Sequence, residues 1–182
     1  MKTESTAKYI LRLAVTLLLI TGVVAAALAG VNMITEPRIE AAKQAKLQQA
    51  IEAVLPGGGD PVAFTDTTGT ISQVYGSEIG YAVEVNPAGF GGAITMMVGV
   101  DKEGNVLGID IVSHAETAGL GAVADADTAA GEAFRGQFVG ASGSVAVSKD
   151  GGTVDAITGA TITSRAVCAG VNAALECVAN MG

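Results

Sequence analysis

An uncharged run of 19 residues, Leu13–Val31, places the strongest constraint on what this chain can fold into. At a rise of about 1.5 Å per residue, a helix of that length nearly spans the roughly 30 Å hydrocarbon core of a bilayer. Tyr9 and Ile10 lengthen the apolar stretch, and the guanidinium of Arg12 can extend to the interface. Residues 1–35 are therefore predicted to form a cytoplasmic tip and a transmembrane anchor in contact with membrane lipid.

The distribution of charge predicts how this anchor is oriented. Lys2, Lys8 and Arg12 against Glu4 give residues 1–35 a net charge of +2, and since the whole chain carries −8, the remainder carries −10. Cationic flanks stay on the cytoplasmic side of a membrane. We therefore expect a single-pass protein of the inner or cytoplasmic membrane, with its N-terminus in the cytoplasm and its acidic body outside.

A cleaved signal peptide is the alternative to a retained anchor. Ala27-Leu28-Ala29 offers an acceptable small-residue cleavage site. The apolar run is longer than the usual signal-peptide core of about 7–15 residues, which favours the anchor. In both cases the acidic body is exported.

Composition excludes several classes of function. An acidic body repels phosphate backbones, so a nucleic-acid binder that works by counterion release is excluded. Aromatic residues make up only 4% and Trp is absent, which argues against ligands stacked on aromatic platforms. Two cysteines, no Cys-x-x-Cys pair and a single histidine give no zinc-finger or iron–sulfur motif, so no metal site is predicted.

The exported part begins with a predicted helical stalk over residues 36–60. Thr35 is expected to cap this helix, and Pro37 stands near its first turn, where proline is tolerated. Apolar residues recur near helical spacing from Ile39 to Leu55. Pro56 and the three glycines that follow it are expected to end the helix.

The remaining residues, 61–182, predict one α+β domain. Asp101–Asn105 has the composition of a hairpin turn between two alternating runs. Short links of this kind favour an antiparallel sheet with helices packed on it, behind the N-terminal transmembrane helix. The predicted strands cover 71–75, 81–85, 93–100, 106–112 and 144–148, and the predicted helices cover 122–135 and 162–179.

The last predicted helix has one broad apolar face. Cys168 and Cys177 are nine residues apart, on opposite sides of this helix and about 13.5 Å from each other. A disulfide needs less than about 7 Å between Cα atoms, so we expect two buried, unpaired thiols. At 100° per residue, the apolar face contains Ile162, Ala166, Val167, Gly170, Val171, Ala174 and Val178.

A run of small and hydroxyl residues, Asp155-Ala-Ile-Thr158-Gly159-Ala160-Thr161, leads directly into that helix. The first amides of a helix lack partners within the helix and attract phosphate. Gly159 and Ala160 allow a ligand to approach the backbone. The structural alternative is an ordinary cap, because Thr and Ser are common capping residues.

This run resembles the flavinylation motif of the FMN-binding domain family. The family includes the G subunit of the Rnf ion-translocating electron transport complex and the C subunit of the sodium-translocating NADH:quinone reductase. The resemblance implies that the phosphate of FMN is esterified to Thr161, with Asp155, Thr158, Gly159 and Ala160 around the attachment point. It also implies a flavin transferase that takes FMN from FAD with a magnesium ion.

A second segment extends the resemblance to roughly residues 70–180. His114-Ala-Glu116-Thr117-Ala118-Gly119-Leu120-Gly121 is similar to the family's His-x-Glu-Thr-Pro-Gly-Leu-Gly segment, with Ala118 where the family usually has Pro. Taken alone, it reads as a lone histidine followed by a glycine-bounded turn. With the resemblance, Glu116, Thr117, Gly119 and Leu120 are predicted to form one wall of the flavin site, Thr117 facing a polar ring edge and Leu120 the ring plane.

The function implied by the resemblance is a membrane-anchored electron carrier with covalently bound FMN. It would belong to an Rnf-type complex that couples electron transfer between ferredoxin and NAD to sodium or proton transport, with other membrane and peripheral subunits as partners. No dinucleotide fingerprint is present, so the chain is not expected to have a complete active site of its own. One alternative is the quinone reductase's C subunit, against which the chain's 182 residues favour the Rnf type. A stand-alone exported flavoprotein of extracellular electron transfer and a module without flavin remain open.

Overall fold

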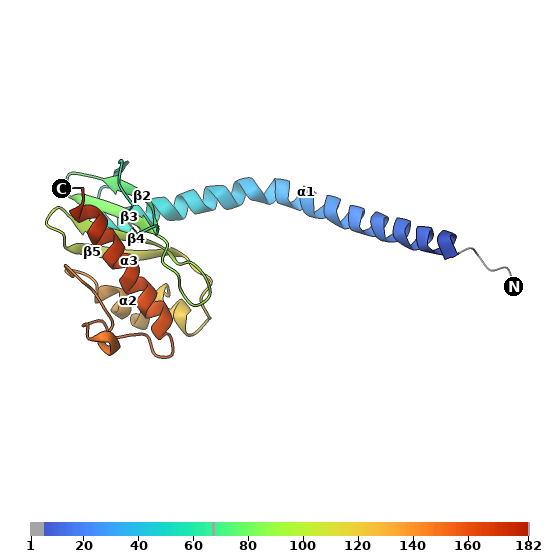
Figure 1. Cartoon of the computed structure of the whole chain (residues 1–182). Helices are drawn as coiled ribbons and strands as arrows, with labels where there is room; N and C mark the ends of the chain where they lie inside the picture. The colour runs from blue at the N-terminus through green and yellow to red at the C-terminus, as the bar shows by residue number, and fades with distance from the viewer. Residues whose placement is uncertain (1–5, 67, 182) are drawn as a thin grey trace. The chain divides into compact units, whose positions relative to one another are not determined.

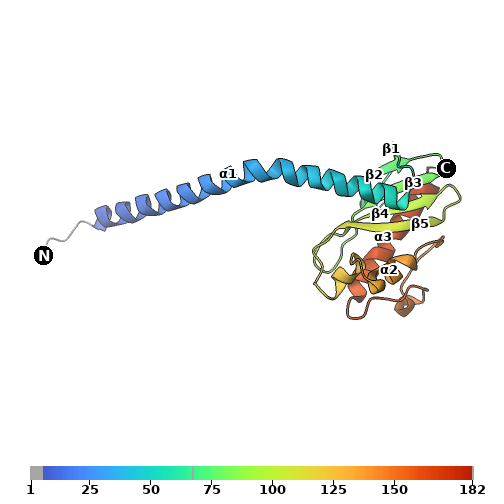
Figure 2. The same cartoon turned by 180° about the vertical axis from the view of Figure 1, so that it is seen from behind.

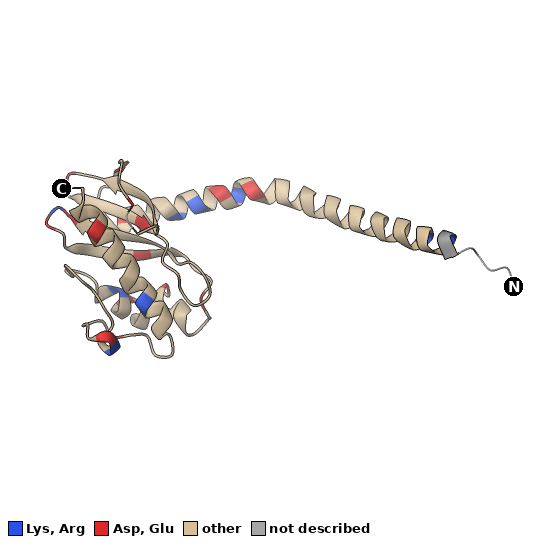
Figure 3. Ribbon diagram, in the orientation of Figure 1, with Lys and Arg blue, Asp and Glu red and all other residues tan. Residues whose placement is uncertain are grey.

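The computed structural model describes residues 6–66 and 68–181, and the chain divides into two units between Ala45 and Lys46. Helix α1, Thr6–Val54, contains all of the first unit that is described and continues into the second. By length and composition it could cross a membrane. Figure 3 shows its uncharged stretch in tan, followed by acidic and basic residues toward its carboxyl end.

The predicted break between anchor and stalk is wrong, because α1 is continuous through Thr35 and Pro37. Thr35 is not a cap: its hydroxyl donates to the carbonyl oxygen of Val31, at 3.0 Å, within the helix. A proline inside a helix removes one backbone hydrogen bond and bends the helix, but the neighbouring turns are intact here. The expected end is confirmed, since α1 stops at Val54 just before Pro56.

The second unit contains a five-stranded sheet in the order β1-β2-β3-β4-β5, antiparallel throughout, as the sequence predicts. The hairpin turn is confirmed: Asp101 Oδ1 accepts from the Asn105 amide at 2.7 Å, and Gly104 has φ +84°. The two-residue β1 was not predicted. The strands are β1 Asp60–Pro61, β2 Ile71–Gly76, β3 Gly80–Val85, β4 Thr95–Asp101 and β5 Val106–Ser113.

Both faces of this sheet are covered. Helix α3, Thr161–Ala179, crosses one face, and the last turns of α1 pack against the other (Figures 1 and 2). The alternation of side chains along the strands explains this: Val83 and Val98 point to the α3 side, while Ala82 and Met97 join residues 50–55. The body is therefore anchored on the end of α1 by burial of apolar side chains.

Two further predicted elements differ from the structure. The helix predicted over 122–135 is two pieces, a 3₁₀ turn η1, Gly121–Ala124, and helix α2, Ala129–Gly136, because Thr128 caps α2 by accepting from the Gly131 amide. The strand predicted over 144–148 is absent. Val147 makes one isolated bridge with Val154, and the chain then turns through η2, Ser148–Asp150, into Gly151 at φ +86°.

Helix α3 buries the predicted apolar face from Ala166 to Val178, but Ile162 is 51% exposed. The prediction failed at Ile162 because the helix pattern does not reveal that the first turn lies beside a cavity. Cys168 and Cys177 are buried and free, as expected. Burial raises the pKa of the Cys168 thiol to about 11, which suits a packing role.

Gly99 of β4 is required by the approach of α1. A Cβ added there would lie 2.2 Å from the carbonyl oxygen of Val54, whereas one added at Gly108, its partner on β5, would meet nothing within 4 Å. We expect Gly99→Ala to lower the free energy of unfolding by about 1–3 kcal/mol and Gly108→Ala to change it by less than about 0.5 kcal/mol. Chemical denaturation of the full chain in detergent micelles measures both, and equal effects would contradict this packing.

Candidate functional site

The predicted motif forms a tight turn at the amino end of α3. The Ala160 amide donates to the carbonyl oxygen of Ile157 at 2.9 Å, and Gly159 has φ +78°. Ser164, fully buried, accepts from the Ile157 amide and donates to the Ala160 carbonyl oxygen, both at 3.0 Å. The residue at the N-cap position of α3 is Ala160, and no side chain of the described residues caps the helix there. The alternative that the hydroxyl residues of the motif are ordinary helix caps is therefore wrong.

A cavity of about 350 Å³ opens beside this turn. It brings together six of the nine residues predicted for the site, namely Glu116, Thr117, Leu120, Gly159, Ala160 and Thr161. These come from two segments some forty residues apart in the sequence. The cavity is also lined by Phe90, Gly121, Lys149, Ile162 and Thr163.

Three apolar side chains in this cavity remain open to solvent. Phe90 is 68% exposed, Leu120 42% and Ile162 51%. Leu120 lies against the motif turn, because a Cβ added at Gly159 would be 3.0 Å from its Cδ2 atom. The cavity therefore has an apolar, accessible wall next to the Thr161 hydroxyl, which is the kind of lining that flat organic ligands bind.

Glu116 fixes the cavity by joining three segments. Its Oε1 accepts from the Gly91 amide at 2.9 Å, and its Oε2 accepts from the Thr163 hydroxyl at 2.5 Å. Glycines leave room for the carboxylate, since a Cβ at Gly89 or Gly121 would come within 2.4–2.5 Å of its oxygens. Burial raises the pKa of Glu116, but the hydrogen bonds from Thr163 and the loop amides lower it more, so the net shift is downward.

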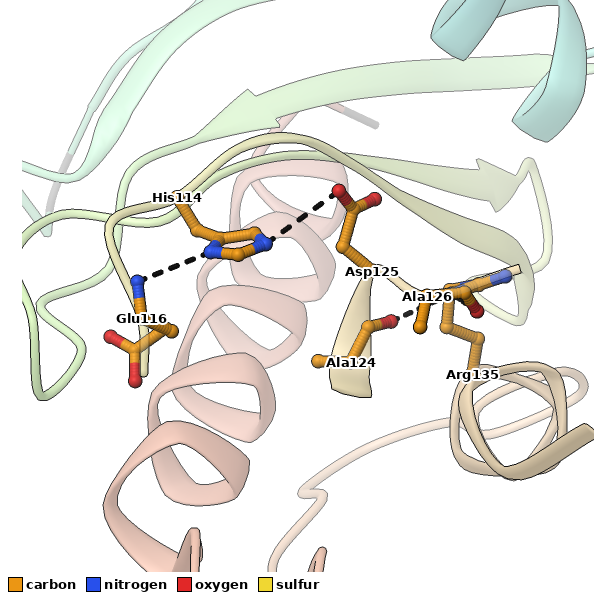
Figure 4. A network of polar contacts seen from close by, with 6 residues as sticks. All are labelled: His114, Glu116, Ala124, Asp125, Ala126 and Arg135. Atoms are coloured by element: carbon orange, nitrogen blue, oxygen red, sulfur yellow. Dashed lines mark hydrogen bonds and ion pairs between the residues drawn. The ribbon is translucent and has the colours of Figure 1, made fainter. Parts of the chain in front are cut away.

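His114 holds the backbone of the same loop (Figure 4). Its Nδ1 accepts from the Glu116 amide at 3.1 Å, and its Nε2 faces the Asp125 carboxylate at 3.6 Å. Since Nδ1 is the acceptor, Nε2 carries the proton in the neutral ring. Arg135 of α2 adds a second support by donating to the carbonyl oxygens of Ala124 and Ala126, at 2.7 and 3.3 Å. His114 is thus a structural support for the loop.

The other three predicted residues lie elsewhere. Gly119, Asp155 and Thr158 line a second cavity of about 620 Å³, next to α2. The backbone of Asp155 is held by Gln137, whose Oε1 accepts from the Asp155 amide at 2.7 Å and whose Nε2 donates to its carbonyl oxygen at 3.2 Å. The residues of the motif are therefore divided between two cavities, and the sequence of the motif does not indicate this division.

Lys149, which comes from η2, also lines the cavity and was not predicted from the sequence. Its Nζ donates to the Thr161 hydroxyl at 3.3 Å. Asp150 beside it forms a two-pronged ion pair with Arg165 of α3, with both N–O distances 2.6 Å. The only signal in the sequence was a cation shortly before the motif, and the contact depends on how the eleven intervening residues fold. Over the described parts of the chain, no group of three or more His, Cys, Asp or Glu residues could hold a metal ion.

Two protein families match the sequence, one in each part of the chain. Residues 89–176 match the FMN-binding domain, and residues 1–54 match the RnfG N-terminal region. The G subunit of the proton-translocating ferredoxin:NAD(+) oxidoreductase complex of Clostridium ljungdahlii is 39% identical over 165 residues, covering 86% of this chain and 83% of that protein. The chain belongs to the RnfG family of ion-translocating oxidoreductase complexes.

Two other relatives extend over nearly the whole length. The G subunit of the ion-translocating oxidoreductase complex of Methanosarcina acetivorans is 32% identical, covering 96% of this chain and 97% of that protein. The G subunit of the Na(+)-translocating ferredoxin:NAD(+) oxidoreductase complex of Acetobacterium woodii is 30% identical, covering 96% and 94%. The family resemblance predicted from the two motifs is confirmed.

The Glu116 bridge predicts a pH-dependent contribution to stability. Because folding lowers the pKa of Glu116 below its ordinary 4.5, the stabilisation is complete at neutral pH and is lost as the pH falls through the folded-state value. At pH 7 we expect Glu116→Gln to destabilise the protein by roughly 1–3 kcal/mol. The difference from wild type should shrink below pH 4.5.

Urea denaturation of the full chain at several pH values measures this. Glu78→Gln, in the exposed turn between β2 and β3, is the matched control and should follow the wild type throughout. A Glu116→Gln difference that stays constant from neutral to acid pH would contradict the assignment of a charged bridge.

Proposed function

We propose that this protein is a membrane-anchored electron carrier with FMN attached through its phosphate to Thr161, acting as the G subunit of a complex that couples ferredoxin:NAD electron transfer to ion transport. The observation that carries the proposal is that Thr161 lines an open, partly apolar cavity in a domain of the FMN-binding family. The relatives' names support the complex, and give both proton and sodium as the transported ion.

The residues around Thr161 fit such a group. Gly159 and Ala160 keep the turn free of bulky side chains, and Phe90, Leu120 and Ile162 offer apolar surface for the ring system. A cavity of about 350 Å³ suits part of a ligand of that size. When bound, FMN supplies the redox chemistry, and the protein's task is to hold and orient it.

The group of this chain that forms the new bond would be the Thr161 hydroxyl. Its oxygen would form the ester bond to phosphorus while the pyrophosphate bond of FAD breaks, AMP leaves and the hydroxyl proton is released. A flavin transferase with magnesium would carry out this step. Thr161 is half-buried and lines the open cavity at the start of α3, which supports modification by a separate enzyme.

We further propose that α1 anchors the protein as a single-pass inner or cytoplasmic membrane protein, with the N-terminus in the cytoplasm and residues 61–182 outside. The uncharged stretch of α1 and the match of residues 1–54 to the RnfG N-terminal region support the anchor. The cations before the stretch support the orientation. In this arrangement residues 36–60 connect membrane and body, and the other members of the complex and membrane lipid are the partners.

Modification of Thr161 is directly testable. In cells with an active flavin transferase, we expect the peptide that contains Thr161 to carry the mass of an FMN adduct. Thr161→Val should abolish the adduct because the nucleophilic oxygen is gone, whereas Thr161→Ser keeps a hydroxyl and should retain part of it. Peptide mass spectrometry measures both. Recovery of only unmodified wild-type peptide under these conditions would overturn the proposal.

The role of Leu120 can be separated from attachment. Leu120→Asp leaves Thr161 untouched, so we expect the adduct to form, but a carboxylate beside the ring should make reduction harder and lower the flavin midpoint potential. Val139→Asp is the matched control, because Val139 is also an exposed apolar residue, 59% accessible, outside this cavity. A redox titration in which both variants match the wild type would mean that the 116–121 loop is only a linker.

A further inference from the structure

Lys149 occupies an unusual position for an exposed lysine. Its ammonium group donates to the hydroxyl of Thr161 at 3.3 Å, and both residues line the cavity. A hydrogen bond to a neutral hydroxyl stabilises this position of the lysine only slightly, because water solvates the ammonium equally well and leaves the side chain free to move. The contact becomes useful when the partner oxygen is part of an anion.

The segment that carries Lys149 is fixed from three sides. Val147 and Val154 are buried in the core on either side of the turn, and Gly152 lies so close to Ala146 that a Cβ would be 1.9 Å from its carbonyl oxygen. The Asp150–Arg165 pair then ties the turn to α3.

Arg165 stands one helical turn after Thr161, so its ion pair fixes Lys149 relative to the hydroxyl. The hydrogen bonds from Arg165 lower the pKa of Asp150, which keeps the pair charged at neutral pH. The pair is exposed and contributes little to the free energy of unfolding, so its role is to hold the turn that carries Lys149 in place against α3.

The balance of charge in the cavity gives Lys149 a role. Of the described residues that line it, only Glu116 and Lys149 carry formal charge. The carboxylate of Glu116 is already engaged by Gly91 and Thr163, and its negative charge opposes a second anion nearby. A phosphodiester on Thr161 would add one negative charge to this acidic body, and Lys149 is the cation in this lining that can reach it.

We propose that Lys149 binds the phosphate that links the flavin to Thr161, and that the Asp150–Arg165 pair positions it. This inference rests on the proposed attachment at Thr161 and adds an anion-binding residue outside the two sequence motifs. Asp150 and Arg165 are positioning residues, since they act on the phosphate only through Lys149.

The test follows adduct formation on the full chain in detergent micelles with flavin transferase, FAD and magnesium, using intact-protein mass. A charge-assisted hydrogen bond to the entering phosphate is worth about tenfold in rate, so we expect Lys149→Gln to be modified about tenfold more slowly and Lys149→Arg to stay within about threefold of wild type. Lys102→Gln, in the exposed β4–β5 turn, makes the same change in net charge and should match the wild type.

Asp150→Asn separates positioning from simple electrostatics. It removes a negative charge near the site, so net charge alone would speed the reaction, whereas loss of the ion pair to Arg165 should slow it. A rate at or above that of the wild type would overturn the positioning role.

The attached phosphate provides a second readout. After prolonged incubation, we expect the ³¹P resonance of Lys149→Gln to be shifted from that of wild type and Lys102→Gln, because the phosphate has lost its cation. If the resonance does not move, Lys149 does not bind the phosphate, even if the rate has fallen.

The outcomes distinguish this proposal from the one it rests on. A wild-type chain that gains no flavin mass removes both, because no phosphate is then placed at Thr161. If the wild type is modified and Lys149→Gln is modified at the same rate, the role of Lys149 is contradicted. The attachment at Thr161 then still stands. Unchanged circular dichroism of the unmodified variants shows that they fold.

Discussion

The carboxylate of Glu116 is the contact on which the candidate site depends. It joins the loop that carries Phe90, the loop that carries Leu120 and the first turn of α3, which are remote from one another in sequence. A buried or half-buried carboxylate is tolerated only when its oxygens are hydrogen-bonded, and both are here. Over the described residues, this bridge is the hydrogen-bonded link between the wall of the cavity and the helix turn that carries Thr161.

The glycines around Glu116 follow from the same contact. Gly89 and Gly121 leave room for its oxygens, and Gly91 approaches the carbonyl oxygen of Ala115 so closely that a Cβ would be 2.0 Å away. The abundance of glycine in this chain is thus explained in part by close approach of backbone to a side chain and to other backbone. His114 holds the backbone of Glu116 as well, because its Nδ1 accepts from the Glu116 amide.

The sequence was a good guide where structure is local and a poor one where it depends on distant contacts. The hairpin at Asp101–Asn105 and the helix behind Thr161 were predictable because turn chemistry and apolar periodicity lie within a few residues. The break expected at Thr35 was wrong, because one proline does not outweigh the intact turns on either side. Lys149 and Gln137 could not have been assigned, because their partners, Thr161 and Asp155, are reached only through folding of the intervening loop.

The openness of the cavity bears on why a covalent bond would be used at all. Its apolar wall is between 42% and 68% exposed, so a ligand resting on it removes less surface from water than one in an enclosed pocket. Affinity from such contacts has to offset the loss of translational and rotational freedom on binding. The proposed ester to Thr161 would remove that requirement and let the wall serve orientation alone. The same openness would leave the ring system accessible to the next redox partner, so an exposed wall and an attached cofactor would be complementary in an electron carrier.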